Sequence, residues 1–333
     1  MARRAVLGCL DGYNGTVFAY GQTGSGKTFT ISGGVDHFSQ RGITPRALEL
    51  LFLEVQRQCS PGDVCVRVSY LEIYNEVVYD LLGEPSPDAP LDLVGPNLPR
   101  VTLLEEGDGS LAYRNLSQHV ADSAEEALGL LYKGDMARAV AETSMNTVSS
   151  RSHCVFTAHV TSRQSDSDTV RKAKLHIVDL AGSERVGKSG IDGTLLTEAK
   201  HINLSLSYLE QVIVALQERA AGVSRSHVPY RNSALTSVLR DSLGGNARTA
   251  MVATISPLAS AIEEGVSTCR FAQRVAMVTN SVSKNEEVDP QLVIKRLKDQ
   301  LAELRAEVRD DARRCVRALA CGSHGFGARC SYV

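Results

Sequence analysis

Gly21-Gln-Thr-Gly-Ser-Gly-Lys-Thr28 is the stretch of this sequence that decides the fold. It fits the pattern G-x-x-x-x-G-K-[ST], in which glycines let the backbone curl so that N–H groups point at phosphate oxygens. The preceding run, Thr16–Tyr20, is rich in β-branched and aromatic residues and predicts a strand, and a helix is predicted from Lys27. A merely glycine-rich turn is the alternative, but the preceding strand and the motifs downstream argue against it. The sequence therefore predicts a phosphate-binding loop between a strand and a helix.

This motif gives two side chains a defined chemical role. The ammonium of Lys27 would bridge the β- and γ-phosphates of a nucleotide, and the hydroxyl of Thr28 would bind Mg²⁺. We expect nucleotide contacts from the whole loop, namely Gly21, Gln22, Thr23, Gly24, Ser25, Gly26, Lys27 and Thr28.

A second phosphate-site motif, Val178-Asp-Leu-Ala-Gly182, ends the apolar run Lys174–Asp179. Asp179 at the end of a strand can hold a metal through water, and the N–H of Gly182 is free to meet a γ-phosphate. The pattern D-x-x-G is weak by itself. Upstream, 146–153 supplies hydroxyls and one guanidinium, although a loop of this composition is more often simply solvated.

Around these motifs, β-rich runs alternate with helical patterns, which predicts an α/β domain with a central sheet. Gly83–Pro99 carries five prolines and is expected to be a surface insertion. Besides Thr16–Tyr20, the predicted strands are Val64–Tyr74, His153–Thr161, Lys174–Asp179 and Thr249–Ile255. Besides the one at Lys27, the predicted helices are Thr44–Gln58, Ser123–Met136, Thr197–Ala220, Ser233–Ser242 and Glu263–Val278.

The composition limits the classes of partner that we expect this protein to bind. The chain has 333 residues, 43% hydrophobic and 22% charged, with 36 Lys and Arg against 38 Asp and Glu. A net charge of -2 provides no general attraction to nucleic acid, and no apolar run approaches the roughly 18 residues of a membrane helix. We therefore expect neither nucleic acid nor a membrane as a partner. Eight Cys without paired spacing favour reduced thiols in a cytosolic protein.

The pattern changes after Pro290. Apolar residues then recur at intervals of 3 and 4, which is typical of a coiled coil, at Ile294, Leu297, Leu301, Leu304 and Val308. The repeat meets Asp311 after about two heptads, so only a short coiled-coil start is predicted. The last segment, 309–333, is expected to be disordered, because the stretch from Cys315 to Cys330 matches neither heptads nor a core pattern. A zinc site is the alternative, but the spacing of Cys315, Cys321, His324 and Cys330 is wrong for the usual paired ligands.

Taken together in chain order, several segments resemble a kinesin motor domain: Ala19–Thr28, Ser149–His153, Val178–Arg185, His227–Thr236 and Asp241–Asn246. The resemblance runs from about Leu10 to the end of the heptad segment. Ser207–Val214 and Phe271–Ala276 look most similar to the ninth kinesin subfamily, which is associated with cilia and flagella.

The resemblance implies a P-loop NTPase fold with a mixed β-sheet flanked by helices on both faces, and it implies site roles. Ser149–His153 would be switch I and Asp179–Glu184 switch II. Ser150 would join Thr28 near Mg²⁺, and Arg151 would pair with Glu184 when the site closes. Asn146 would order the phosphate side, and Phe29 would lie against adenine. Such a site needs no strong base, because phosphoryl transfer depends mostly on positioning and charge stabilisation.

The resemblance also implies function and domains. We expect an ATP-hydrolysing microtubule motor domain at 1–278, a neck linker with a short coiled-coil start at 279–308, and a tail at 309–333. ATP and Mg²⁺ would be the cofactors, microtubules the partner, and a homodimer could form through the coiled coil. The expected location is the cytoplasm and its microtubules, with the cilium as a further expectation.

Two departures from the family pattern affect these expectations. Kinesin motors usually carry strands before the phosphate loop, including a central one, so this chain is expected to be an N-terminally truncated motor with a hole in its sheet and impaired activity. On the expected track-binding side, Ser233-Ala-Leu-Thr-Ser237 stands where many kinesins have Lys and Arg. Ala181–Ala250 holds eight Lys or Arg against six Asp or Glu, so weak or salt-sensitive binding to acidic tubulin is expected.

Two other functions fit part of this pattern. A signalling GTPase shares the phosphate loop and D-x-x-G, but it would need an Asn-Lys-x-Asp guanine-reading motif that this sequence lacks. A non-catalytic kinesin fragment that binds tubulin or another partner without hydrolysing ATP is the stronger alternative.

Overall fold

The computed structural model describes residues 2–34, 37–58, 63–84, 98–107, 109–145, 151–163, 169–184, 194–223, 227–288 and 290–321. The chain divides into two compact units. The first comprises Met1–Arg163 and Arg171–Glu286, and the second comprises Gln164–Val170 and Glu287–Val333. In the described part of the chain, every helix is too short or too polar to cross a membrane.

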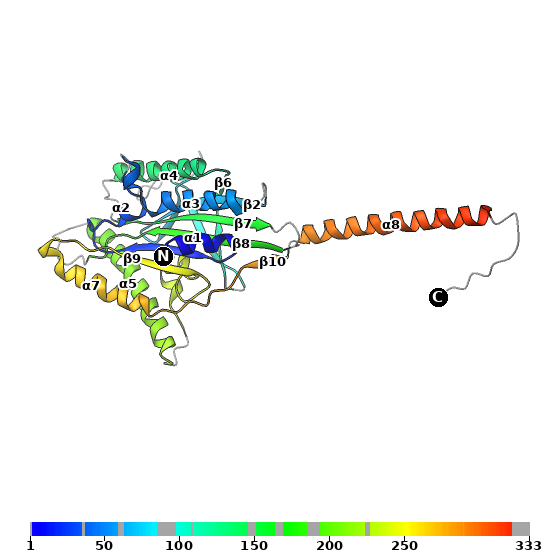
Figure 1. Ribbon diagram of the computed structural model, residues 1–333. Coiled ribbons are helices and arrows are strands. Elements are labelled where there is room, and N and C mark those ends of the chain that lie inside the picture. The colour runs from blue at the N-terminus through cyan, green and yellow to red at the C-terminus, as the bar shows by residue number, and fades with distance from the viewer. Residues whose placement is uncertain are drawn as a thin grey trace. The chain divides into compact units, whose positions relative to one another are not determined.

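A single mixed sheet organises the first unit (Figure 1). Its strand order is β5-β4-β3-β2-β7-β8-β1-β9, with β6 paired to β2 and β10 paired to β8. β1 runs parallel to both β8 and β9, whereas β2 is antiparallel to β3, β6 and β7. The strands are β1 (Gly15–Tyr20), β2 (Val64–Tyr74), β3 (Val77–Asp80), β4 (Arg100–Glu105), β5 (Leu111–Arg114), β6 (His119–Ala121), β7 (His153–Arg163), β8 (Thr169–Asp179), β9 (Arg248–Ala253) and β10 (Glu286–Val288).

Helices cover both faces of this sheet, as predicted. Successive β1 residues enter different apolar clusters, because strand side chains alternate between faces. Val17 and Ala19 join the cluster with α1, α3 and α4, whereas Phe18 joins the cluster with α5, α6 and α7. The helices are α1 (Ala2–Leu10), α2 (Lys27–Ile31), α3 (Ile43–Gln58), α4 (Ala124–Met145), α5 (Thr194–Ala220), α6 (Ala234–Val238), α7 (Ile262–Ala276) and α8 (Pro290–Cys321).

The long helix α5 is held to the sheet by one apolar stripe. Its buried residues recur at the helical spacing of three and four, so they share one face. The apolar ones are Leu206, Leu209, Val212, Ile213, Ala215 and Leu216. The stripe fixes the helix against the strands that carry the predicted site.

The expectation of a hole in the middle of the sheet is wrong, as the position of β1 shows. β1 has a paired neighbour on each side, with Gly15–Tyr20 opposite Arg248–Ala253 of β9 in continuous register. Among the described strands, β9 lies at the end of the order and pairs with β1 alone. The middle of the described sheet is therefore continuous.

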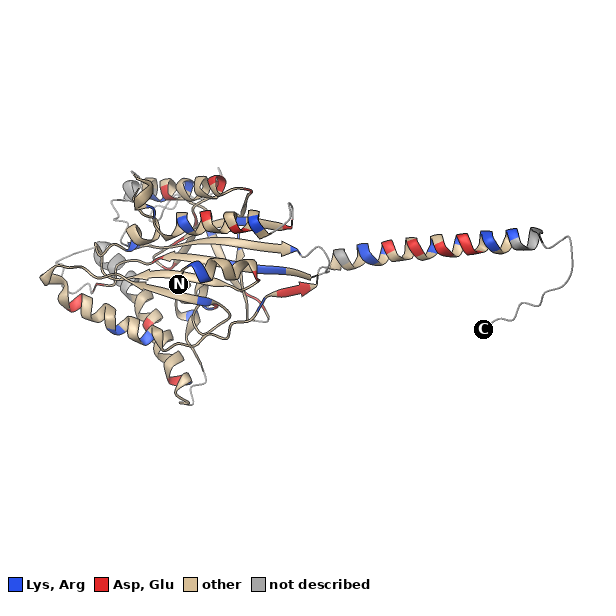
Figure 2. Cartoon of the chain, in the orientation of Figure 1, with Lys and Arg blue, Asp and Glu red and all other residues tan. Residues whose placement is uncertain are grey.

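The helix in the second unit extends beyond its predicted end. The residues of its heptad stripe are about half or more exposed, as at Leu297 (49%) and Val308 (67%). The helix continues through Asp311 to Cys321, so 309–321 is helical rather than disordered, and 322–333 lies outside the described residues. Charged residues recur along α8 between residues 295 and 317 (Figure 2), which suits a helix whose polar faces meet water.

Candidate nucleotide site

The phosphate loop connects the end of β1 to the start of α2, as the sequence predicts. Gly21 follows the strand with φ +157°, and a Cβ at this position would lie 2.2 Å from the backbone oxygen of Thr254. Only glycine fits so close to this neighbouring backbone. The hydroxyl of Ser25 lies 2.7 Å from that of Thr254, so a hydrogen bond joins the loop to the residue that follows β9.

Lys27 is buried at the first position of α2, with 7% of its surface exposed. Its Nζ donates a hydrogen bond of 2.9 Å to the backbone oxygen of Gln22, within the loop. Burial lowers the pKa of Lys27, and the nearby carboxylates of Asp179 and Glu184 oppose that effect. A buried ammonium at this place can neutralise phosphate charge with little competition from water.

Thr28 and Asp179 join the two phosphate motifs. The Thr28 hydroxyl donates to Oδ2 of Asp179 at 2.6 Å. The other carboxylate oxygen, Oδ1, is buried without a hydrogen-bond partner among the described residues. Burial raises the pKa of Asp179, while the Thr28 hydroxyl, Arg138 and Lys27 lower it.

This arrangement fits a magnesium ion. Mg²⁺ prefers hydroxyl, carboxylate and water oxygens, and it keeps several of its waters when bound. The unpartnered Oδ1 of Asp179 would accept a hydrogen bond from such a water, and the Thr28 hydroxyl would be a direct ligand of the ion. These two residues would hold the ion.

The residues after Asp179 pack directly onto the phosphate loop. The N–H of Ser183 donates to the Gly21 oxygen at 3.1 Å. The Glu184 carboxylate accepts two hydrogen bonds from Thr23, from its N–H at 2.8 Å and its hydroxyl at 2.5 Å. A Cβ at Gly182 would lie 2.3 Å from the Thr23 hydroxyl, so a larger residue would separate the two motifs.

His153 is a positioning residue to which sequence reasoning gave no role. Its Nδ1 accepts the N–H of Ala181 at 3.1 Å, so the proton of the neutral ring lies on Nε2, which is 2.8 Å from the Ser205 hydroxyl. Burial lowers the pKa of His153 to about 3 and keeps the ring neutral. The ring thus connects β7, the segment after β8, and α5. Its place at the end of Ser149–His153 and at the start of a predicted strand was the available signal.

Arg138 of α4 is a second residue that sequence reasoning missed. Its side chain is 9% exposed, and its Nε lies 3.6 Å from the Glu72 carboxylate. Its Nη1 lies 4.0 Å from Oδ2 of Asp179, and its Nη2 donates to the Ser152 hydroxyl at 3.3 Å. The guanidinium therefore lies within ion-pair distance of Asp179 and lowers its pKa. No local motif marks it, because an Arg in a helical pattern is usually solvated.

The remaining predicted residues have mixed outcomes. Phe29 lies on α2 with 58% of its surface exposed, which leaves its ring free for a ligand. Arg151 is half-buried just before β7, and its pairing with Glu184 stays a prediction. Asn146 and Ser150 lie outside the described residues.

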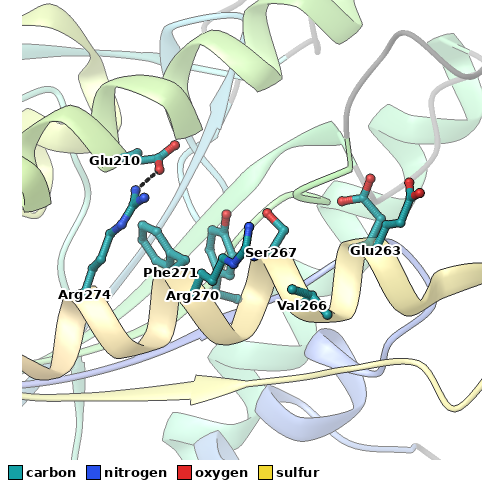
Figure 3. Close-up of a pocket in the computed structure, with 9 residues that line it drawn as sticks. Glu210, Glu263, Val266, Ser267, Arg270, Phe271 and Arg274 are labelled. Carbon is teal, nitrogen blue, oxygen red and sulfur yellow. Dashed lines mark hydrogen bonds and ion pairs between the residues drawn. The ribbon is translucent and has the colours of Figure 1, made fainter.

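A pocket of about 330 Å³ lies beside the end of β1, between α5 and α7 (Figure 3). Its lining includes Tyr20, whose ring stacks on that of Phe271 with 4.1 Å between ring centres. Arg274 of α7 pairs with Glu210 of α5 at its edge. None of the residues 21–28 lines it, so this pocket is distinct from the phosphate site. The Tyr20–Phe271 stack joins α7 to the residue before the phosphate loop, and the Arg274–Glu210 pair joins α7 to α5.

A mixed sheet, a glycine loop that ends in a buried Lys, and a hydrogen bond between Thr28 and Asp179 together define the P-loop class of proteins. The kinesin motor domain profile matches residues 1–278. This chain belongs to the kinesin motor family.

Two curated relatives show the extent of the likeness. Kinesin-like protein KIF9 of Mus musculus is 43% identical over 310 residues, covering 92% of this chain and 38% of the relative. Kinesin-like protein KLP1 of Chlamydomonas reinhardtii is 45% identical over 312 residues, with the same two coverages. Both matches agree with the resemblance to the ninth subfamily. This chain spans only 38% of the length of these relatives.

Solved structures confirm the fold. A fast kinesin matches with a TM-score of 0.75 and 40% identity, over 86% of this chain and 77% of that one. A KIF14 dimer, described with AMP-PNP in complex with a microtubule, matches with a TM-score of 0.76 and 36% identity, over 89% of this chain and 80% of that one.

Proposed function

We propose that this chain is a motor domain that binds Mg-ATP and hydrolyses it when it engages microtubules. The observation that carries the proposal is the hydrogen bond from Thr28 to Asp179 beside the buried Lys27. It brings together, from two distant segments, the charged and hydroxyl groups that phosphoryl transfer requires. Membership of the kinesin family supports the choice of nucleotide and track.

The chain's own residues supply positioning and charge. Lys27 would neutralise phosphate oxygens, and the backbone N–H groups of the glycine loop would orient them. Bound Mg²⁺ would contribute further charge neutralisation between phosphates. Glu184 binds Thr23 in this structure, and we propose that it exchanges this partner for Arg151 when the site closes around a water molecule.

The relatives support a proposal for the partner and the location of this chain. The KIF14 structure is described in complex with a microtubule, and we propose the same kind of track for this chain. A location on cytoplasmic microtubules follows from that partner, and the likeness to KIF9 and KLP1 makes the cilium the specific place to look. We also propose that α8 forms a homodimer through its exposed heptad stripe.

The test is steady-state ATPase activity with and without microtubules, for the 333-residue chain and for Glu184→Ala. Glu184→Ala is expected to leave ATP binding nearly unchanged and to lower microtubule-stimulated hydrolysis at least about tenfold, because the closing pair is lost. Glu303→Ala, an exposed carboxylate on α8, is the matched control and should behave as wild type. A chain that binds microtubules without any stimulated hydrolysis would instead be a non-catalytic binding module.

A further inference from the structure

Two arginines beside the short helix α6 share a single carboxylate. Nε of Arg231 lies 2.6 Å from Oε2 of Glu105, and Nη1 of Arg240 lies 2.8 Å from Oε1. Glu105 ends β4 and precedes these residues by 126 and 135 positions. The fold, rather than local sequence, therefore creates this three-residue cluster, which we call the Glu105 clamp.

The clamp is well defined although it faces solvent. The side chain of Glu105 is 26% exposed, whereas Arg231 is 73% and Arg240 is 37% exposed. The two guanidinium groups lower the pKa of Glu105 to about 2, so the carboxylate is ionised throughout the physiological range. The Arg240 guanidinium also lies 5.6 Å from the ring centre of Tyr230.

The clamp changes the charge available to a partner. The segment Ala181–Ala250, which includes both arginines, has only two more basic than acidic residues. Glu105 comes from outside that segment and reduces this small excess further. Exposed ion pairs are individually weak, so an acidic surface that offers several carboxylates can displace Glu105 from its arginines.

On the basis of the proposed function, we propose that Glu105 is an internal competitor that lowers the affinity of Arg231 and Arg240 for the acidic surface of tubulin. Microtubule binding then includes an exchange, in which both arginines leave Glu105 for carboxylates of the track. Affinity is set by the strength of the clamp as well as by the number of basic residues.

The experiment measures the Kd for microtubules in AMP-PNP by cosedimentation. Glu105→Gln keeps the shape of the side chain but removes its charge, and it is expected to bind about threefold to fivefold more tightly at low salt. The gain should shrink at about 300 mM salt, where screening weakens exposed charge interactions. Glu106→Gln is the matched control, because this exposed neighbour accepts from the Ser110 hydroxyl and is not in the clamp. The gain in microtubule affinity of Glu106→Gln should be clearly smaller than that of Glu105→Gln.

A double-mutant cycle tests the mechanism itself. In an Arg231→Gln, Arg240→Gln background, Glu105→Gln is expected to change the Kd by less than about 1.5-fold, because no arginines remain to be released. If Glu105→Gln strengthens binding equally in this background, it acts through general surface charge, and the competitor proposal is wrong. Unchanged or weaker binding by Glu105→Gln, in a protein that still unfolds cooperatively, also overturns it.

A second probe separates this proposal from the proposed function. Poly-L-glutamate offers carboxylates without a tubulin lattice, and Glu105→Gln should bind it more tightly than wild type. If poly-L-glutamate gives this result but microtubules bind neither protein, the assignment of the track is wrong while the clamp acts as inferred. If microtubules stimulate the ATPase but neither probe responds to Glu105→Gln, the function holds and the clamp proposal is wrong.

Discussion

The charged residues of the candidate nucleotide site come from distant parts of the chain. Lys27 and Asp179 lie in motifs with fixed spacing, and their positions at the phosphate loop and at a strand end could be predicted from sequence because the loop geometry follows from the glycines. Arg138 and His153 could not be assigned in this way. Their roles depend on which strand or helix the fold brings beside them, and only the structure supplies those contacts.

Lys27→Ala is the direct test of the phosphate loop. The variant removes the buried ammonium that backbone dipoles cannot replace, so Mg-ATP binding should be lost in a titration with a fluorescent nucleotide analogue. Lys133→Ala, at an exposed position of α4, is the control and should bind normally. Wild-type affinity in a folded Lys27→Ala protein would remove the assignment of this loop.

At the scale of elements, tertiary hydrogen bonds help to decide where the helix α6 ends. The sequence predicts a helix over Ser233–Ser242, yet α6 ends at Val238. The Ser242 carbonyl accepts from the Asn280 side chain at 3.0 Å, and the Leu243 carbonyl accepts from the Tyr230 hydroxyl at 2.6 Å. These partners hold the chain in turns where local propensity favours more helix.

Other elements show where sequence patterns succeed and fail. The long strand β2 matches its prediction residue for residue, because an extended β-branched and aromatic run has few alternatives. The short strands β3 to β6 were not predicted, since three to six residues carry little periodic signal. The helix α1 was also missed.

The side chain of Ser233 caps the N-terminus of α6, and its contribution to stability can be tested. The Ser233 hydroxyl accepts the N–H of Leu235 at 3.1 Å and donates to Glu76 at 2.9 Å. Ser233→Ala should therefore lower the free energy of unfolding by about 1 to 2 kcal/mol, measured by urea denaturation. Ser281→Ala, at an exposed position, should change it little. Equal stability of the two variants would show that the cap contributes nothing.

The exposed stripe of α8 predicts self-association. Leu301→Glu places a charge in the middle of the stripe, where Leu301 is 53% exposed in the single chain. Wild type should show a monomer–dimer equilibrium in analytical ultracentrifugation, and the variant should remain monomeric. Ala306→Glu, on the charged side of the same helix, is the control and should dimerise like wild type. A monomeric wild-type protein at high concentration would contradict the proposed dimer.

For the whole molecule, buried histidines on the central strands make the free energy of unfolding depend on pH. Burial lowers the pKa of His153 and His176 to about 3 and that of His159 to about 4. The neutral rings favour the folded state above the unfolded pKa of about 6.5, and this contribution is lost as the pH falls and the unfolded chain binds protons. The contribution of these histidines to the free energy of unfolding should therefore decrease in mild acid.

The expected size of this effect is large. Between pH 7.5 and 5.5, each histidine should remove about 1.4 kcal/mol from the free energy of unfolding, or about 4 kcal/mol for all three. His176→Gln should reduce this pH dependence by about one third, whereas the exposed His227→Gln serves as control. Urea denaturation at the two pH values measures it. An identical pH dependence in wild type and His176→Gln would show that His176 does not contribute.

The position of β9 at the end of the sheet affects how the protein behaves in concentrated solution. The N–H groups of Arg248 and Thr254 donate to the chain of β1, so by strand alternation those of Thr249, Met251 and Ala253 face away from it. Within the described residues, this row of donors and its half-buried apolar side chains have no neighbouring strand. Such a row is a template on which another molecule can add a strand. Storage at high protein concentration should therefore favour slow aggregation that begins at β9. Storage at a lower protein concentration is the simplest way to prevent it.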